Sequence, residues 1–481
     1  MKKHYCKALV VIAILVLVVA CGGINGPDTT SGSDVGEGQA DPSGDEYSAP
    51  GAPVESGPAP PTYVAIAGDL LPPDLADVVT AMGGEVLQTF EAVGLAVVSL
   101  DGDAAAEELR TAAELLSVVP NVKLNWLGTN RAISESESVT ESIGDDEPGY
   151  TQYQWNLLAI DAAAAWDAGY TGSGVKVAVL DSGVNTDHID LASNINIADS
   201  ISFVPDDLSI ADCCGHGTHV AGIIAGADNG IGMIGVAPGA ELVVVKVLDS
   251  DGIGNLDWVI QGILYANAIG ADIINMSFGT TVQRRGIYDE EGAEVASAAD
   301  VAEIVGALMR TINYVHSHGS LVVTSAGNDS LDTTGDAGVV HLPSDAGQTI
   351  SVSATGPIGW IEDKDTDLDV PAFYTNYGSA IDLAAPGGNG SDDASSYHDG
   401  IFSTHTVSAD GTPTWSWTFG TSQAAAHVSG VAALVIQAHE GAIEPAAVME
   451  ILKESADDLG KPGRDEWYGH GRINAAAAVT Q

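Results

Sequence analysis

Three polar residues that lie far apart in the sequence have the types needed to cleave an acyl bond. Ser422 follows a glycine and a threonine and precedes small and apolar residues over 424–435, a pattern that predicts a buried helix with Ser422 in its first turn. The unpaired N–H groups and positive dipole of a helix start would stabilise negative charge developing beside this serine. Such a serine becomes a nucleophile only if a base takes its proton and a third group orients the base.

A carboxylate and a histidine that could serve these two roles occur earlier in the chain. Asp181 ends an apolar run and precedes a Ser-Gly turn, so its carboxylate should lie at the carboxyl end of a strand. His216 is flanked by glycines and begins a predicted helix over 217–227. An aspartate before Ser-Gly also caps turns, and a lone histidine is more often structural. The order Asp, His, Ser, each in a glycine-bearing turn, favours nucleophilic catalysis.

The elements around these turns predict an α/β domain. Short apolar runs predict strands, and helical stretches lie between them. The predicted strands are 175–180, 242–248, 273–278, 321–325 and 350–353, and the helices are 217–227, 256–268 and 295–316. Near-continuous apolar strands separated by helices indicate a mainly parallel sheet covered on both faces. In such sheets functional residues gather beyond the carboxyl ends of the strands.

The charge of the chain excludes one class of partner. The 481 residues include 66 acidic and 16 basic side chains, for a formal net charge of −50. Nucleic acid is therefore excluded as a partner, because a protein this acidic repels phosphates. A well-solvated acidic surface explains the charge, and adaptation to saline surroundings or to several bound cations is the alternative.

Residues 1–20 have the pattern of an export signal. Three lysines precede an apolar run over 8–20, which is too short to span a bilayer comfortably. The segment 18–22 resembles a bacterial lipobox, in which Cys21 would be lipidated and become the mature N-terminus. An ordinary cleaved signal with an incidental cysteine is the alternative. We expect an exported precursor that is lipid-anchored at the cell envelope.

The rest of the chain divides into four segments by composition. Residues 21–61 are rich in Gly, Pro, Ser and acidic residues and predict a disordered tether. Residues 62–127 predict a small α+β domain with helices over 73–82 and 104–116 on one face of its strands. One strand of this domain is predicted over 121–126. An acidic linker over 128–150 precedes the α/β domain at 151–481.

Cys213 and Cys214 are the cysteines that remain beyond the signal and Cys21. They are adjacent, so no disulfide can join distant parts of the fold. Two free thiols are one possibility, and a vicinal disulfide in a strained eight-membered ring is the other.

Three motifs resemble those of the subtilisin-like serine proteases, the subtilase family. They are residues 177–183 around Asp181, 215–222 around His216, and 420–430 around Ser422. The resemblance implies a three-layer fold and a serine endopeptidase that hydrolyses peptide bonds through an acyl-enzyme. It assigns Ser422 as the nucleophile, His216 as the base and Asp181 as the residue that orients His216. We expect a monomer.

The same resemblance assigns further site residues. Asn328 matches the oxyanion-hole asparagine of the family. Substrate contacts are implied for Gly252, Ile253 and Gly254, which would pair with an extended peptide, and for Ser277, Phe278, Gly279, Ser325, Ala326 and Gly327, which would line a side-chain pocket. Phe278 could instead belong to the core. Backbone pairing favours broad specificity, whereas the long segments 280–319 and 356–416 would suit a processing protease of narrow specificity.

A calcium site is also implied by the resemblance. Asp190 and Asn229 would supply side-chain oxygens, and Ala227, Ile231 and Met233 would supply carbonyls. Gln152 or Gln154 would be a further ligand, although the spacing there does not match cleanly.

Residues 62–127 resemble the subtilase propeptide, which is an intramolecular chaperone and inhibitor. Autoprocessing in the linker would leave the lipid on this domain and free the catalytic domain. A binding protein on a catalytically dead protease scaffold is the alternative from another class. The presence of Asp181, His216, Ser422 and Asn328 argues against it. Proline and methionine are usual in the family where Ala426 and Gln423 stand, and neither change touches the triad.

Overall fold

The computed structural model describes residues 61–128, 152–212, 214–289, 291–334, 338–390, 394–407 and 412–481. The export signal, Cys21, the tether, most of the acidic linker and Cys213 lie outside these ranges. The chain separates into two units, Met1–Gly57 and Pro58–Gln481, and the described residues belong to the second. None of the helices within the described ranges combines the length and the apolar character needed to cross a membrane.

The small domain is a four-stranded antiparallel sheet with two helices. Its sheet has the order β2-β3-β1-β4, and the element order is the β-α-β-β-α-β of ferredoxin-like folds. Its elements are β1 (Thr62–Ile66), α1 (Leu75–Ala81), β2 (Glu85–Phe90), β3 (Leu95–Ser99), α2 (Asp103–Ala112) and β4 (Ser117–Pro120). The helix predicted to reach residue 116 ends at Ala112, because the next residues turn to pair with β1 as β4.

Alternating residues give this small sheet two buried faces. Tyr63 and Ala65 pack in a cluster with Leu75 and Leu109 of the two helices. The intervening Val64 belongs to a different cluster, which includes residues of α8 (Ala298–Ser317) in the α/β domain. The sheet of the small domain is therefore packed between its own helices and the larger domain.

The strand predicted over 121–126 does not join the small sheet. It forms β5 (Lys123–Asn125), which pairs antiparallel with β9 (Ile253–Asn255) of the larger domain. The segment that ends the small domain thus lies along an edge of the other domain.

A seven-stranded parallel sheet organises the larger domain and confirms the predicted fold class. Its order is β17-β16-β14-β10-β6-β8-β7. The strands are β6 (Lys176–Asp181), β7 (Ile201–Ser202), β8 (Glu241–Lys246), β10 (Ile273–Met276), β14 (Leu321–Ser325), β16 (Ile350–Thr355) and β17 (Leu383–Pro386). The five long apolar runs in the sequence correspond to β6, β8, β10, β14 and β16, and the short β7 and β17 were not predicted.

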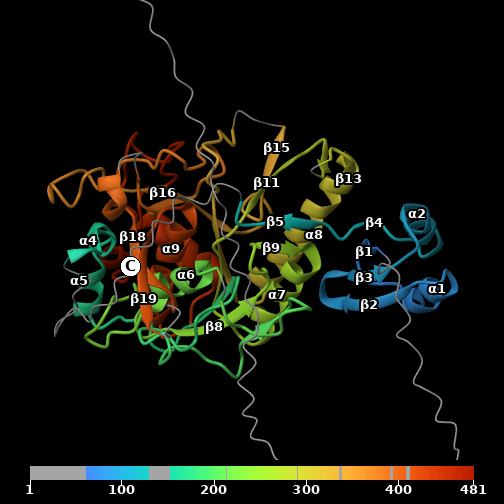
Figure 1. The fold of residues 1–481 in the computed structure, drawn as a ribbon, viewed down its shortest axis with the longest axis horizontal. Helices are drawn as coiled ribbons and strands as arrows, with labels where there is room; N and C mark the ends of the chain where they lie inside the picture. The colour runs from blue at the N-terminus through green and yellow to red at the C-terminus, as the bar shows by residue number, and fades with distance from the viewer. Residues whose placement is uncertain are drawn as a thin grey trace, which may run out of the picture. The chain divides into compact units, whose positions relative to one another are not determined.

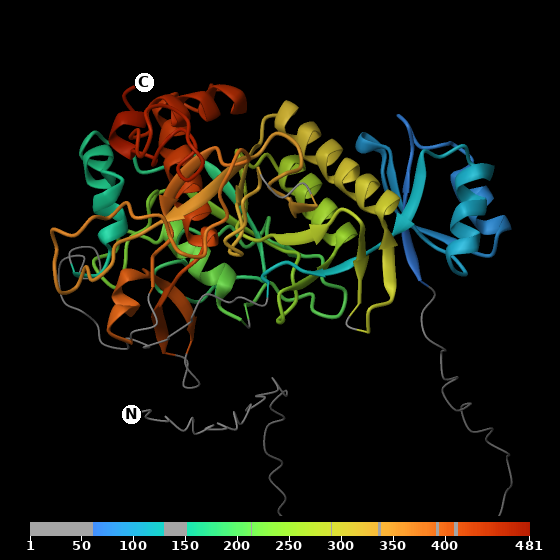
Figure 2. The ribbon, with the colours of Figure 1, turned by 90° about the horizontal axis from the view of Figure 1, so that it is seen from above.

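Helices cover both faces of this sheet (Figure 1). On β6, Val177 and Val179 pack in the cluster of α6 (His216–Ala225) and α9 (Thr421–Ala438). The intervening Ala178 and Leu180 pack in the cluster of α7 (Leu256–Ala268) and α8. The result is the three-layer arrangement expected for a parallel sheet. Figure 2 shows the same layers after a 90° turn.

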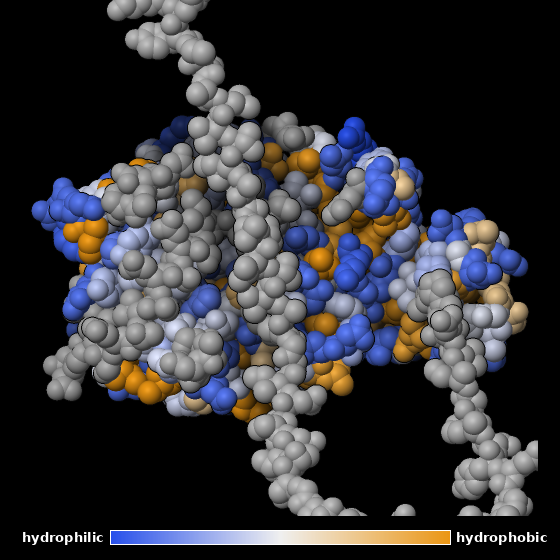
Figure 3. Space-filling model, viewed as in Figure 1, coloured by the Kyte–Doolittle hydropathy of each residue, from blue (hydrophilic) through white to orange (hydrophobic). Residues whose placement is uncertain are grey.

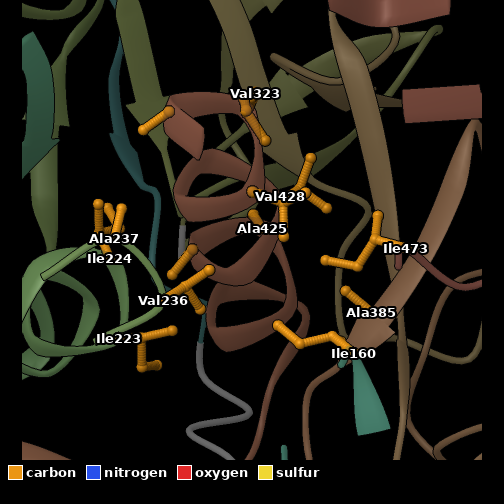
Figure 4. Close-up of a cluster of buried hydrophobic side chains, with 14 of the residues drawn as sticks. Ile160, Ile223, Ile224, Val236, Ala237, Val323, Ala385, Ala425, Val428 and Ile473 are labelled. Carbon is orange, nitrogen blue, oxygen red and sulfur yellow. The ribbon is translucent and has the colours of Figure 1, made fainter. Parts of the chain in front are cut away.

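Helix α9 runs through the core. All residues from Thr421 to Ile436 are buried, which explains why its sequence contains almost no large polar side chain. Figure 4 shows Ala425 and Val428 of this helix among Ile224, Val236 and other apolar side chains. A Cβ at Gly430 would lie 2.5 Å from the Val236 Cβ, so a glycine is needed for this close approach. The helix start is consequently held rigidly.

Shorter elements surround the sheet. Helix α8 begins at Ala298 rather than at the predicted 295, because Ser297 and Asp300 form a capping box and Glu294–Ser297 pair as a strand. The other elements are η1 (Glu91–Val93), α4 (Trp155–Ala159), α5 (Ala162–Asp167), β11 (Thr280–Gln283), β12 (Gly286–Tyr288), β13 (Glu294–Ser297), β15 (Val339–Leu342), η2 (Ala394–Asp399), β18 (Ile401–Val407), β19 (Pro413–Thr418), α10 (Pro445–Glu454) and α11 (Ala475–Ala478). On the face seen in Figure 3, hydrophilic and hydrophobic residues are interspersed.

Candidate active site

Asp181 and His216 form a hydrogen-bonded pair at the end of β6 and the start of α6. The two Asp181 carboxylate oxygens lie 2.8 and 3.0 Å from His216 Nδ1. Because a carboxylate only accepts, His216 Nδ1–H is the donor and Nε2 is left as the basic nitrogen. The Asp181 side chain is buried, whereas that of His216 is 21% exposed. A Cβ at Gly217 would overlap the Gly183 carbonyl, which explains the glycine after the histidine.

Ser422 lies in the first turn of α9, as the sequence predicts. The Ser277 hydroxyl donates to the Ser422 carbonyl at 2.8 Å and fixes this turn. Helices α6 and α9 pack against each other, so the elements that carry His216 and Ser422 are neighbours. Ser277 and Asn328 follow β10 and β14, and the site therefore gathers at the carboxyl ends of the parallel strands.

Asn328 lies beside the start of α9. Its Oδ1 accepts hydrogen bonds from the backbone N–H and the hydroxyl of Thr421, both at 2.9 Å. With Oδ1 engaged in this way, Nδ2 is the group that can donate to a ligand. Asn328 and Ser422 line the same pocket, so this donor and the nucleophile candidate face one space.

That pocket has a volume of about 260 Å³. Four of the six residues predicted to line a side-chain pocket lie in its wall. These are Phe278, Gly279, Ser325 and Gly327. Ser277 and Ala326 are buried and do not line it. Phe278 both lines the pocket and belongs to a buried cluster, so each interpretation of this residue holds in part.

Several polar lining residues were not predicted, and three of them, Thr281, Asp329 and His341, form a hydrogen-bonded group. The Thr281 hydroxyl donates to Asp329 Oδ2 at 2.8 Å, so His341 Nδ1–H, at 2.9 Å, must be the donor to Thr281. Burial lowers the pKa of His341, which favours its neutral form. No motif marked these residues, because pairing of β11 with β15 brings Thr281 and His341 together.

The chain's own segment 123–128 occupies the predicted substrate edge. Beside the β5–β9 pairing, Trp126 N donates to the Gly252 carbonyl and Trp126 Nε1 donates to the Gly254 carbonyl, each at 2.9 Å. Gly279 N donates to the Trp126 carbonyl at 2.8 Å. The Trp126 ring meets Phe278 edge-on with centroids 5.6 Å apart. Residues 125–128 complete the wall of the pocket beside Ser422.

Arg310 on α8 links the small domain to the larger one. Its Nη1 donates to the carbonyls of Ala67 and Val93, at 2.7 and 3.1 Å. Leu256 N and Asp257 N, at the start of α7, donate to residues 122 and 121 respectively. Residues 62–127 are therefore held by hydrogen bonds from the Arg310 side chain of α8 and from backbone N–H groups of α7, as well as by β9.

Of the residues predicted to bind calcium, Asn229 and Met233 are both in contact with Asp190. Asp190 is fully buried, and its Oδ1 lies 3.1 Å from Asn229 Nδ2. Asp190 Oδ2 accepts hydrogen bonds from Met233 N at 3.0 Å and from Trp415 Nε1 at 2.7 Å. Burial raises the pKa of Asp190 to about 6. No lysine, arginine or histidine forms a salt bridge with it in the described part of the chain.

A buried carboxylate without a cationic partner has the chemistry of a hard-cation ligand. In this structure its oxygens accept from three N–H donors, and the Oδ1 of Asn229 is turned away to accept from Ile231 N at 3.0 Å. Among the described residues there is no cluster of three His, Cys, Asp or Glu side chains that could hold a metal, so backbone and amide oxygens would have to supply most ligands. Gln154 does not join this set, because both atoms of its amide bond to the backbone of Ile234, and Gln152 is exposed.

Three other histidines near the site are deeply buried. Burial lowers the pKa of His219 to about 3, and the pKa values of His188 and His427 to about 4. His427 Nδ1–H donates to the Gln423 carbonyl at 2.8 Å, and its Nε2 accepts from Asn156 Nδ2 at 2.7 Å. These histidines are structural and neutral near pH 7.

A buried Asp–His pair, a serine at a helix start and an amide donor beside it, all at one edge of a parallel sheet, define a serine hydrolase of the α/β class. Residues 172–471 match the sequence pattern of the Subtilase family. Because this match covers more than half of the chain, the protein belongs to the subtilase family and is a serine endopeptidase.

Characterised relatives share much of the chain. Subtilisin NAT of Bacillus subtilis subsp. natto is 32% identical over 407 residues, which are 84% of this chain and 85% of the relative. M-protease of Shouchella clausii is 36% identical over 325 residues, covering 68% and 69%. Subtilisin Savinase of Lederbergia lenta is 35% identical over 325 residues, covering 68% and 98%.

Solved structures share the fold. The epidermin leader peptide processing serine protease of Staphylococcus aureus is 23% identical, with a TM-score of 0.67 over 87% of this chain and 97% of that one. A protease of Pseudoalteromonas arctica is 30% identical, with a TM-score of 0.55 over 70% and 98%. A lanthipeptide protease is 28% identical, with a TM-score of 0.57 over 69% and 95%.

Proposed function

We propose that this protein is an exported endopeptidase whose triad is Asp181, His216 and Ser422. The observation that carries the proposal is the bond between His216 Nδ1 and the buried Asp181 carboxylate, which leaves Nε2 as a base. Ser422 Oγ attacks the peptide carbonyl carbon while His216 Nε2 takes its proton. His216 then protonates the leaving amine. In the second half of the reaction, His216 takes a proton from water as the water attacks the acyl-enzyme, and it returns this proton to Ser422 Oγ.

The oxyanion of the tetrahedral intermediate would be held by two donors. Asn328 Nδ2 is one, because its Oδ1 is engaged by Thr421. The backbone N–H of Ser422, at the helix start, is the other. Donors fixed before the reaction stabilise the transition state without reorganisation.

We further propose that residues 62–127 are a propeptide that inhibits the enzyme until it is removed. Support comes from the pairing of β5 with β9 and from residues 125–128 in the pocket wall, since a substrate would need both places. Cleavage in the acidic linker, followed by departure of the small domain, would open the cleft. If Cys21 is lipidated, the catalytic domain would be released while the small domain keeps the anchor.

Broad specificity is the proposal that the edge strand favours. β9 contacts a peptide through its backbone, which reads few side chains. A processing protease of narrow specificity is the second candidate, and it is favoured by the polar pocket residues Thr281, on β11 in the long segment 280–319, and His341, on its partner β15. The lanthipeptide protease among the structural neighbours is consistent with this second candidate.

Calcium is the cation we propose at Asp190. Asp190 would hold it together with carbonyls from residues 227–233 and with Asn229, whose amide would turn to present Oδ1, and the cation would neutralise the buried carboxylate. Its contribution would be to the stability of this loop, and no catalytic step involves it.

The test is the intact mass of the protein and of its Ser422→Ala variant, both expressed without the export signal and incubated with calcium. We expect only the unsubstituted protein to lose the region before about residue 151. A serine-directed covalent reagent should then label Ser422. If neither protein is processed, a second protease is used to cut the linker and remove the small domain; failure of the reagent to label Ser422 after that removal would show that the catalytic proposal is wrong and would favour the binding-protein alternative. If neither is processed but the reagent labels Ser422, only self-processing is excluded.

A further inference from the structure

Asp212 accepts five hydrogen bonds immediately before the helix that carries His216. Its Oδ1 accepts from Cys214 N at 3.1 Å, from Gly215 N at 3.0 Å and from Ser182 Oγ at 3.1 Å. Its Oδ2 accepts from the backbone N–H of Thr218 at 2.9 Å and from the Thr218 hydroxyl at 2.6 Å. One side chain thus satisfies backbone donors on both sides of His216.

These bonds fix the turn from which the imidazole projects. The first N–H groups of a helix have no partner within the helix and need a cap. The N-cap residue of α6 is Gly215, which has no side chain to supply one. Asp212 caps Thr218 N instead, and Ser182 Oγ accepts from Gly217 N at 3.3 Å. The negative charge of the Asp212 carboxylate also interacts favourably with the positive, N-terminal end of the α6 dipole.

Asp212 is also connected to Asp181. The Ser182 hydroxyl lies 3.1 Å from Oδ1 of Asp181 and 3.1 Å from Oδ1 of Asp212, so its single proton is shared between two carboxylates. Asp181 is fixed by β6, and His216 is fixed by α6. Asp212 and Ser182 are the side chains that join these two elements beside the pair.

We propose that Asp212 is a positioning residue that holds the His216 imidazole against Asp181 and adds a second negative charge to its surroundings. The proposal rests on the proposed catalytic role of His216. Asp212 has no contact with substrate in this assignment and acts through the turn at 214–218.

Of the other titratable groups around this turn, Cys214, His405 and His219 are neutral near pH 7. Lys246, which donates to the Ala211 carbonyl at 3.0 Å, forms an ion pair with Asp207. Burial, helped by the Asp212 charge, raises the pKa of the Cys214 thiol to about 12. His405 on β18 lies against Gly215, where a Cβ would be 2.5 Å from His405 Nε2, and burial lowers its pKa. His219 on α6 is fully buried with a pKa of about 3. With Lys246 balanced by Asp207, Asp181 and Asp212 are the carboxylates at this turn that would stabilise a protonated His216.

The experiment compares Asp212→Ala and Asp212→Asn with Asp206→Asn in the full chain. Asp206 is exposed in the same connecting segment and its carboxylate makes no hydrogen bond to the described residues, so its variant removes a charge alone. After the linker has been cut and the small domain removed from each protein, peptide hydrolysis is measured from pH 5 to 9. We expect Asp212→Ala to lower kcat by roughly tenfold to a hundredfold with little change in KM, because a misplaced base slows the chemical step.

The pH profile separates the two parts of the role. Removing a negative charge lowers the pKa of a neighbouring histidine, so the acid limb of kcat/KM should move to lower pH in both Asp212 variants. Asp212→Asn keeps an acceptor for Thr218, so its kcat should be higher than that of Asp212→Ala. Its acid limb of kcat/KM should still lie at lower pH than in the unsubstituted protein. Asp206→Asn should match the unsubstituted protein in both respects.

Two results would overturn the proposal. One is an unchanged kcat and acid limb in Asp212→Ala when the unsubstituted protein is active. If Asp212→Ala does not fold, the His216 Nδ1 proton is followed by NMR in the Ser422→Ala chain with and without Asp212→Asn. A pKa of His216 that is equal in both would be the second contradicting result. An inert unsubstituted protein would instead count against the proposed function.

Discussion

Asn328 Oδ1 accepts two hydrogen bonds from Thr421, the residue that precedes Ser422. The Thr421 hydroxyl in turn accepts from Gly327 N at 3.1 Å. These three bonds lock the loop after β14 to the start of α9. The amide that would bind the oxyanion and the serine that would create it are thus parts of one rigid unit.

Replacing Asn328 by alanine should slow catalysis without unfolding the protein. We expect kcat to fall by about two to three orders of magnitude, because one oxyanion donor is lost. KM for a peptide should change little, since the donor acts in the transition state. Steady-state kinetics of the processed enzyme provide the measurement. An unchanged kcat would remove Asn328 from the site.

Arg310→Ala should weaken the hold on the small domain. The arginine gives two charge-assisted hydrogen bonds to the carbonyls of Ala67 and Val93, and losing them costs about 1.5 to 3 kcal/mol. That range corresponds to a roughly tenfold to hundredfold weaker complex. The interval between cleavage of the linker and full peptidase activity should shorten. Arg285→Ala, whose guanidinium bonds to the neighbouring Gln283, is the matched control. Equal intervals in the two variants would contradict the role of Arg310.

Trp415→Phe should destabilise the Asp190 loop more than Trp417→Phe. Both tryptophans are buried on β19, but Trp415 Nε1 donates to Asp190 Oδ2, whereas Trp417 Nε1 has no partner among the described residues. Loss of a hydrogen bond to a buried charged group costs about 1 to 3 kcal/mol. Thermal unfolding in the Ser422→Ala background measures both variants.

The same pair of variants tests the proposed cation. Terbium at Asp190 would lie beside the Trp415 indole, so its emission on tryptophan excitation should be lost in Trp415→Phe and kept in Trp417→Phe. Chelation of calcium should lower the unfolding temperature of the unsubstituted chain. An unfolding temperature that is independent of calcium would argue against a cation at this place.

His427 should make the fold sensitive to acid. Its folded-state pKa of about 4 lies below the unfolded value of about 6.5, so the unfolded chain binds more protons between these limits. The contribution of His427 is therefore complete above pH 6.5 and is lost as the pH falls toward 4, at up to about 1.4 kcal/mol per pH unit. His427→Gln should reduce this slope by the equivalent of one proton. Urea unfolding from pH 7 to 4 measures it, and parallel curves for the two chains would disprove the assignment.

The sequence predicted the elements that are encoded locally. β6 and β14 are continuous apolar runs, and a buried parallel strand needs nothing else to be recognised. β4 was missed because Ser117–Pro120 follows a helical pattern without a break, and only its pairing with β1 makes it a strand. The strand before residue 127 was placed in the wrong sheet, since its partner β9 lies 128 residues away in the pairing of Asn125 with Ile253.

The site residues divide in the same way into those that local sequence predicts and those that it does not. Asp181, His216 and Ser422 could be predicted from short motifs, because each lies in a glycine-bearing turn at the end of an element. Asp212 and His341 have no such local pattern, and their roles depend on partners that folding brings together. Asp212, four residues before His216, could have been suspected only as an unassigned acid before a helix whose cap residue is glycine.

The burial of α9 has a consequence for how this enzyme can vary. Every residue from Thr421 to Ile436 is buried, and the first turn of that helix also carries Ser422, which lines the pocket. A larger side chain on this helix would strain the packing and shift Ser422. A smaller one would leave a cavity and make the position of Ser422 less rigid. In a library of random variants of this segment, thermal tolerance and turnover should rise and fall together, whereas positions on exposed loops should let the two properties vary independently.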